Sequence, residues 1–281
     1  MISFLFHKEY TMQKWTPKGL IGVVHLPALP GDVRYDGRSV DEIVAFALAD
    51  AKALVEGGAD AMIIENFGST PFPKGTREEP MPPHHTAIMT CVAHEIKKAY
   101  PDTVLGINCL RNDALAALGI AVAVGAAFIR VNVLSGAYVT DQGVIEGCAY
   151  AALRYRQQLG ANHIAILADI LVKHASPLAP TSAADATKDT LHRGGADAVI
   201  VTGAGTGEPV DRRVLEEVYR AADGAPILLG SGTKVETLAN YCTFIKGAIV
   251  GTSLKIDGKI ANAVDAARVR RMSDTLHTLI K

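Results

Sequence analysis

The chain has 281 residues and a formal net charge of −1, with 28 basic and 29 acidic residues mixed along the sequence. This mixture offers no basic surface for phosphate backbones, so nucleic-acid binding is not expected. The longest uncharged run, residues 114–129, is too short to span a membrane and is interrupted by Gly119 and Gly125, so no transmembrane segment is expected either.

Short β-branched runs alternate with longer stretches of apolar residues at helical spacing, which is typical of βα units around a parallel sheet. The expected strands are residues 20–26, 60–66, 103–109, 127–133, 163–170, 197–203, 226–232 and 247–253. The expected helices lie near residues 39–57, 82–100, 111–124, 145–160, 181–194, 209–223, 233–240 and 261–280.

An internal repeat indicates that these units close into a ring. EGGADAMIIEN (56–66) resembles RGGADAVIVTG (193–203), and VGAAFIRVN (124–132) resembles IKGAIVGTS (245–253). These matches lie four units apart, which favours two similar halves of an eightfold barrel over an open doubly wound sheet. We therefore predict one α/β domain over residues 1–281, a (β/α)8 TIM barrel of the phosphate-binding type, with residues 1–17 as an N-terminal extension.

The active site of such a barrel lies at the carboxyl ends of its strands, where this chain is strongly polar. The candidate catalytic residues are Glu65, Asp169 and His25. The candidate substrate-binding residues are Asn66, Asn108, Arg130, Asn132, Lys173, His174 and Thr202. The segment rich in Pro and Gly after Asn66 is either a lid over the mouth or a plain connection.

Each candidate also has a structural interpretation. Glu65 is either a general acid or base, or a partner for a nearby arginine that stiffens the barrel. Asp169 with His174 is a pair of metal ligands or a base with its orienting group. Alternatively, Asp169 accepts hydrogen bonds from the backbone of a buried loop. His25 points into the site or is a satisfied core histidine. Lys173 as a Schiff base is the less favoured choice, because nothing in the sequence indicates an apolar setting.

The last three strand ends carry small residues whose backbone N–H groups can approach an anion closely. The candidate phosphate-binding residues are Gly203, Gly205, Gly207, Gly230, Ser231, Gly232, Gly251, Thr252 and Ser253. One such turn could equally be a helix cap, but three at the same end of one barrel favour a phosphate site.

Several segments also resemble a known family. GVVHLPALPG, GGADAMIIENFGSTPF, LGIN with RND, IRVNV and SGT with GAIVGTSLK are similar to segments of the BtpA/SgcQ family. The resemblance implies a phosphate-binding TIM barrel. The family is named for a cyanobacterial member linked to photosystem I biogenesis, and other members occur in bacterial sugar-utilisation settings. Glu65 is also similar in kind to the strand-two glutamate of tryptophan synthase α-type barrels, although Asn66-Phe67-Gly68 follows it in place of their acidic partner.

Two functions follow as hypotheses. The first is an isomerase or lyase of a small phosphorylated, sugar-phosphate-like molecule, in which Glu65 moves a proton and His25 or Asp169 complements it. Asn108, Arg130 and Asn132 would then hold substrate or stabilise negative charge. The second is a non-catalytic assembly factor, as the family name implies.

Cofactors, location and assembly are less constrained. No cofactor is required by the sequence, but a divalent metal held by His25, Glu65, Asp169 and His174 stays possible, as does a flavin. The four cysteines form no CxxC pair, so we expect a reducing, cytoplasmic location. A homo-oligomer is expected because barrels of this size often pair.

Overall fold

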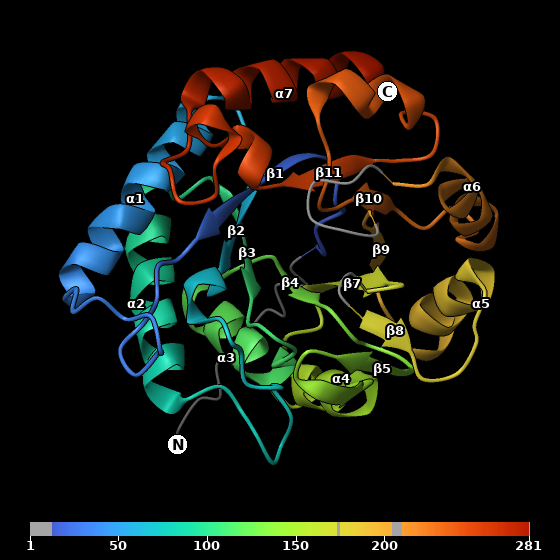
Figure 1. Cartoon of the computed structure of the whole chain (residues 1–281), viewed down its shortest axis with the longest axis horizontal. Helices are drawn as coiled ribbons and strands as arrows, with labels where there is room; N and C mark the ends of the chain where they lie inside the picture. The colour runs from blue at the N-terminus through green and yellow to red at the C-terminus, as the bar shows by residue number, and fades with distance from the viewer. Residues whose placement is uncertain (1–12, 173–174, 204–209, 281) are drawn as a thin grey trace, which may run out of the picture.

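A computed structural model describes residues 13–172, 175–203 and 210–280, and within them a closed barrel of parallel strands surrounded by helices (Figure 1). Around the barrel the strand order is β1-β11-β10-β9-β7-β4-β3-β2. The strands are β1 (Gly19–His25), β2 (Ala61–Glu65), β3 (Val104–Asn108), β4 (Phe128–Val131), β7 (Ala165–Ile170), β9 (Ala198–Val201), β10 (Ile227–Leu229) and β11 (Gly247–Val250). Each overlaps a run that the sequence predicted as a strand, with β1 beginning one residue earlier than expected, and the (β/α)8 fold is confirmed.

Helices connect these strands and cover the outside of the barrel (Figure 1). They are α1 (Val40–Glu56), α2 (Pro83–Ala99), α3 (Ala114–Val124), α4 (Ala149–Gln158), α5 (Ala183–Lys188) continued by the π-helix η2 (Asp189–Arg193), α6 (Arg212–Ala221) and α7 (Ala266–Leu279). Short 3₁₀ helices are η1 (Phe67–Ser69), η3 (Val235–Asn240), η4 (Thr252–Leu254) and η5 (Ile256–Gly258). The helix expected near 233–240 is thus a 3₁₀ helix.

The sequence did not predict a small antiparallel sheet beside the barrel mouth. It consists of β6 (Gly143–Glu146), β5 (Ala137–Thr140) and β8 (Ala175–Pro177), in that order. Because β6 takes up residues 143–146, the helix expected over 145–160 begins only at Ala149. Tyr138 and Ile145 are buried against Val133, next to β4, so this sheet has its own small core.

Alternation along the strands separates two cores. Residues that point outward pack against the helices in one large cluster, whereas residues that point inward fill the barrel with a second cluster. The inward cluster contains Ile21, Val23, Ala61, Ile63, Phe128, Ala165, Leu167, Ala198, Ile200, Leu228 and Ile249. Since the side-chain period of a strand is two, the next inward position on each strand lies at the mouth, directly above this apolar plug.

The lower end of the plug is closed by an aromatic stack. Trp15 stacks on Phe128, with ring centroids 4.8 Å apart and an interplanar angle of 23°. Lys14 forms a 2.7 Å ion pair with Asp197. The extension expected over residues 1–17 therefore contributes two residues, Lys14 and Trp15, to the barrel.

Within the described part of the chain, no helix combines the length and apolar character needed to cross a membrane.

Gly106 makes room for Phe128 at the barrel centre, because a β-carbon on Gly106 would overlap the Phe128 ring. We expect Gly106→Ala to lower the free energy of unfolding by about 1–3 kcal/mol through overpacking. Gly119→Ala is the control, since Gly119 lies in α3 and an added β-carbon would approach the Tyr155 hydroxyl no closer than 3.8 Å. It should be neutral or stabilise by up to about 1 kcal/mol. Equal unfolding midpoints in urea for the two variants would contradict this account.

Candidate active site

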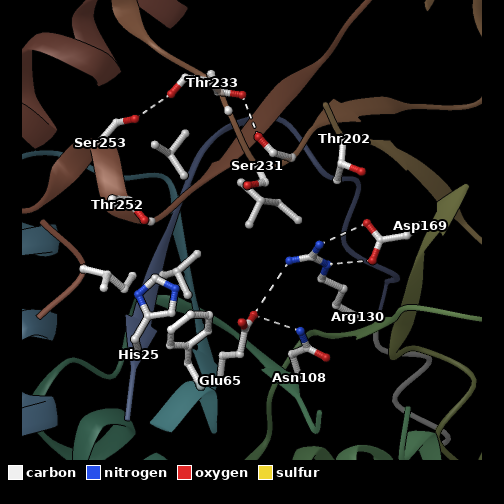
Figure 2. A pocket seen from close by; sticks show the side chains of 18 of the residues that line it. His25, Glu65, Asn108, Arg130, Asp169, Thr202, Ser231, Thr233, Thr252 and Ser253 are labelled. Atoms are coloured by element: carbon white, nitrogen blue, oxygen red, sulfur yellow. Dashed lines mark hydrogen bonds and ion pairs between the residues drawn. The ribbon is translucent and has the colours of Figure 1, made fainter. Parts of the chain in front are cut away.

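A cavity of about 1230 Å³ opens at the carboxyl ends of the barrel strands. Figure 2 shows Glu65 and Asn108 on one side of it and Ser231 and Thr233 on the other, with His25 and Thr252 near each other between them. Its wall includes the described candidates His25, Glu65, Asn108, Arg130, Asn132, Asp169, Thr202, Gly230, Ser231, Gly232, Gly251, Thr252 and Ser253. Residues from opposite halves of the chain therefore meet in one cavity.

Strand register brings four polar side chains to the same height in this cavity. His25 pairs with Glu65 across β1 and β2, and Glu65 pairs with Asn108 across β2 and β3. Ile107 pairs with Ile129, so Asn108 and Arg130 come next on β3 and β4. The sequence predicted these strand ends one by one, and the parallel register explains why they form a continuous row.

The centre of the row is an ionic array of Glu65, Arg130 and Asp169. The Arg130 guanidinium donates two hydrogen bonds to Asp169, from Nε to Oδ2 at 3.1 Å and from Nη2 to Oδ1 at 3.0 Å. Its Nη1 lies 3.7 Å from Oε2 of Glu65. Amides complete the array, since Asn108 donates to Glu65 Oε2 at 2.9 Å and Asn132 donates to Asp169 Oδ2 at 2.7 Å. Figure 2 shows most of these contacts as dashed lines.

This arrangement fixes the charge of Arg130. Burial by itself acts to lower the pKa of the guanidinium, but the carboxylates of Asp169 and Glu65 outweigh it and the pKa is raised. Arg130 therefore acts as a permanent positive charge and not as a proton donor. Asp169 is occupied by Arg130 and Asn132, so its geometry is that of a positioning carboxylate.

Arg111 is a residue of the cavity wall that the sequence did not single out. Burial lowers the pKa of its guanidinium, and the charges of Asp169 and Asp141 counter this only in part. The only sequence feature that pointed to Arg111 was its place in the RND segment just after β3.

The segment that follows Asn66 also reaches the wall, since Thr70 and Phe72 line the cavity.

Asn66 does not reach the cavity. Its side chain is fully buried, and its amide donates to the carbonyl oxygen of Leu110 at 3.2 Å while its oxygen accepts from the Leu110 N–H at 2.7 Å. Asn112 brackets the backbone of Val133 in the same way, at 2.9 and 2.8 Å. The substrate contact suggested for Asn66 does not fit this placement, because both of its polar atoms are used to hold the backbone of the next loop.

The two glycine-rich loops after β10 and β11 are tied together by hydroxyl groups. Thr233 donates to the carbonyl oxygen of Gly230 at 2.7 Å, and Ser253 donates to the carbonyl oxygen of Thr233 at 2.7 Å. The hydroxyl of Ser253 is therefore used inside the protein. Ser231 and Thr252 are the other hydroxyl side chains of these loops, and both line the cavity (Figure 2).

Small residues at these strand ends are required by their neighbours. A β-carbon on Gly251 would overlap the His25 ring, and one on Gly230 would lie 2.6 Å from Cγ2 of Thr202. The His25 ring also contacts Phe67 edge to face, with centroids 4.9 Å apart. Gly232 has a φ of 92°, which favours glycine. Any side chain at position 232 would thus strain the backbone.

Four candidates, Lys173, His174, Gly205 and Gly207, lie outside the described residues. Gly203 is described, and its N–H donates to the carbonyl oxygen of Ser231 at 3.3 Å.

Among the described residues, no three His, Cys, Asp or Glu side chains are grouped as metal ligands would be. Arg130 occupies the space between Glu65 and Asp169 that a cation shared by these two carboxylates would need.

Comparisons with known proteins show similarity to one family over nearly the whole chain. The model of the BtpA family matches residues 16–278. "Photosystem I biogenesis protein BtpA" of Synechocystis sp. is 44% identical over 259 residues, which is 92% of this chain and 87% of that protein. An uncharacterised protein of Pyrococcus furiosus is also 44% identical, over 93% of this chain and 97% of its own.

A solved structure shares the fold. N-(5'-phosphoribosyl)anthranilate isomerase from Pyrococcus furiosus superposes with a TM-score of 0.55 at 12% sequence identity, covering 93% of this chain and all of that one. At this identity the likeness shows the barrel and nothing finer.

We expect Asn66→Ala to lower the free energy of unfolding by about 1–3 kcal/mol, because it leaves the buried N–H and C=O of Leu110 without their partner. Asn262→Ala is the matched control, since the Asn262 amide also donates to a backbone carbonyl, that of Ile256, but at an exposed site. That change should stay within about 0.5 kcal/mol. Chemical denaturation measures both, and an Asn66→Ala variant as stable as the control would show that the bracket is unimportant.

Proposed function

Because the chain belongs to the BtpA family and folds as a (β/α)8 barrel, we propose that it is an enzyme acting on a small phosphorylated metabolite by proton transfer, as an isomerase, an epimerase or a lyase. The observation that carries the proposal is the division of the cavity. A buried carboxylate, Glu65, stands across the cavity from two loops of small residues and hydroxyls (Figure 2).

The loops at 230–233 and 251–253 suit the phosphate of the substrate. They follow the last two barrel strands, where barrels of this fold commonly hold a phosphate. The side chains of Ser231 and Thr252 line the cavity, and Gly230, Gly232 and Gly251 form part of the same wall. A phosphate held there would orient the remainder of the substrate toward Glu65, so binding energy from a non-reacting group would serve the chemistry.

Glu65 is the proposed proton-transfer group. The contacts from Asn108 and Arg130 both go to Oε2, and we assign the proton transfer to Oε1. The fixed Arg130 charge favours the ionised carboxylate and would stabilise negative charge that develops on a substrate oxygen near it. Asn108 holds the carboxylate in one orientation, which reduces the cost of aligning it with the proton to be removed.

His25 is the proposed complementary acid. It lies beside Glu65 in the register of β1 and β2, and it has room in the cavity because Gly251 carries no side chain. Asp169 is the less suitable choice, since both of its oxygens accept hydrogen bonds from Arg130 and one also accepts from Asn132. We assign Asp169 the role of holding Arg130 in place.

The solved isomerase with the same fold acts, by its name, on a phosphoribosyl compound, which supports a phosphorylated substrate by analogy alone. The name of the Synechocystis relative favours the second candidate function, a non-catalytic role in photosystem I biogenesis. That role gives no reason for a buried carboxylate, guanidinium and amide array that faces an open cavity. The equally similar Pyrococcus relative carries a name that says nothing of photosystems.

A screen of thermal stability against inorganic phosphate, sulfate and a panel of sugar phosphates tests the proposal. We expect selective stabilisation by one class of sugar phosphate. Ser231→Asp should abolish this stabilisation, because it places a negative charge in the anion site. Glu65→Gln should retain it, because glutamine keeps the shape and the hydrogen bond from Asn108 is replaced by a similar amide contact.

The matched control is Ser176→Asp, an exposed serine of β8 that does not line the cavity. It adds the same charge away from the loops and should leave the ligand response unchanged. If no phosphate compound raises the melting temperature of the wild type, or if Ser231→Asp responds like Ser176→Asp, the proposed phosphate site is wrong and the assembly role becomes the better hypothesis.

A further inference from the structure

The cavity continues past the proposed phosphate position. Beyond the loops at 230–233 and 251–253 it extends between η3 and the first turns of α7, which pack against each other. We call this extension the outer arm and define it by the wall residues Lys234, Val235, Glu236, Ile260, Arg268 and Arg271. A ligand that ended at the phosphate would leave the outer arm empty, although it belongs to the same cavity as Glu65.

Charge is divided unevenly between the two ends. The inner end of the described wall carries three carboxylates, Glu65, Asp141 and Asp169, against the two guanidinium groups of Arg111 and Arg130. The outer arm carries three cations, Lys234, Arg268 and Arg271, against Glu236 in its wall and Asp265, which lies 3.8 Å from Arg268. The outer arm therefore attracts anions, whereas the inner end suits a neutral hydroxylated group.

One contact joins the outer arm to the phosphate loops. Nη1 of Arg268 lies 3.5 Å from the carbonyl oxygen of Ser253, so its guanidinium stands next to the loop that carries Thr252. Arg271 is one turn further along α7 and pairs with Glu236 at 3.2 Å, with side chains 69% and 66% exposed. An ion pair this exposed is weak, so a ligand anion can take the place of Glu236 at little cost.

We propose that the substrate is a sugar diphosphate ester, in which the first phosphoryl group binds at Ser231 and Thr252 and the second lies in the outer arm against Arg268 and Arg271. This inference rests on the proposed function and narrows its substrate class. The two arginines offer planar forks that suit phosphoryl oxygens. Val235, Ile260 and the buried Met272 supply apolar surface for the group attached beyond the second phosphoryl group.

Calorimetric titration of the wild type with matched pairs of ligands tests the proposal. The pairs are inorganic phosphate with pyrophosphate, ribose 5-phosphate with ADP-ribose, and glucose 1-phosphate with UDP-glucose. We expect the diphosphate member of at least one sugar pair to bind about tenfold more tightly than its monophosphate, since it gains a charge-assisted contact with an arginine.

Arg271→Met should remove most of this preference while the affinity for the monophosphate changes less than about twofold, because Arg271 lies beyond the first phosphoryl group. Arg270→Met is the matched control. Arg270 belongs to the same helix but does not line the cavity, and its guanidinium donates to the carbonyl oxygen of Glu56. This variant should keep the preference and thereby exclude a mere effect of net charge.

The outcomes separate the two proposals. If monophosphates and diphosphates bind the wild type equally, or if the preference survives Arg271→Met unchanged, the outer arm does not hold a second phosphoryl group, although the phosphate site at Ser231 and Thr252 stands. If no phosphate compound binds at all, the proposed function fails and this inference fails with it.

Discussion

The structure of the mouth depends on one buried cation, Arg130, held between the carboxylates of Glu65 and Asp169. Removing such charges from water costs several kcal/mol for each ion, and the cost is recovered only when the partners are close and their remaining polar atoms are bonded. Here Asn108 and Asn132 supply those bonds. Loss of Arg130 would leave two buried carboxylates without a counter-charge, so the array depends on this cation, which together with Asn108 holds Glu65 in one orientation.

The remainder of the barrel keeps this array in place. The apolar plug below it excludes water from one side, and the parallel register sets the height at which each polar side chain enters the cavity. Above it, the asparagine brackets of Asn66 and Asn112 fix the backbone of the loops that follow β3 and β4. Several residues that touch no substrate in this account thus determine how accurately Glu65 faces the ligand, which is the requirement for efficient proton transfer.

Local sequence patterns were sufficient for the barrel and for the polar strand ends of the cavity wall. Periodicity located every barrel strand, and the last inward residue of each strand gave His25, Glu65, Asn108 and Asp169. The antiparallel sheet was missed because its strands are only three or four residues long. In addition, β8 pairs with β5, which is far from it in the sequence. Asn66 looked like a ligand because its partner, Leu110, is 44 residues away. The position of Arg111 depends on the loop after β3, and the outer arm depends on how η3 packs against α7; no local sequence pattern encodes either.

The central claim is that Glu65 transfers a proton to or from a ligand anchored at the phosphate loops. The most direct measurement is the exchange of carbon-bound hydrogen for deuterium in D₂O, followed by NMR on the sugar phosphate that most stabilises the protein. The account predicts exchange with the wild type and a rate at least about 100-fold lower with Glu65→Gln, at similar ligand affinity. A bound ligand that exchanges no hydrogen with the wild type, or exchanges equally fast with Glu65→Gln, would contradict it.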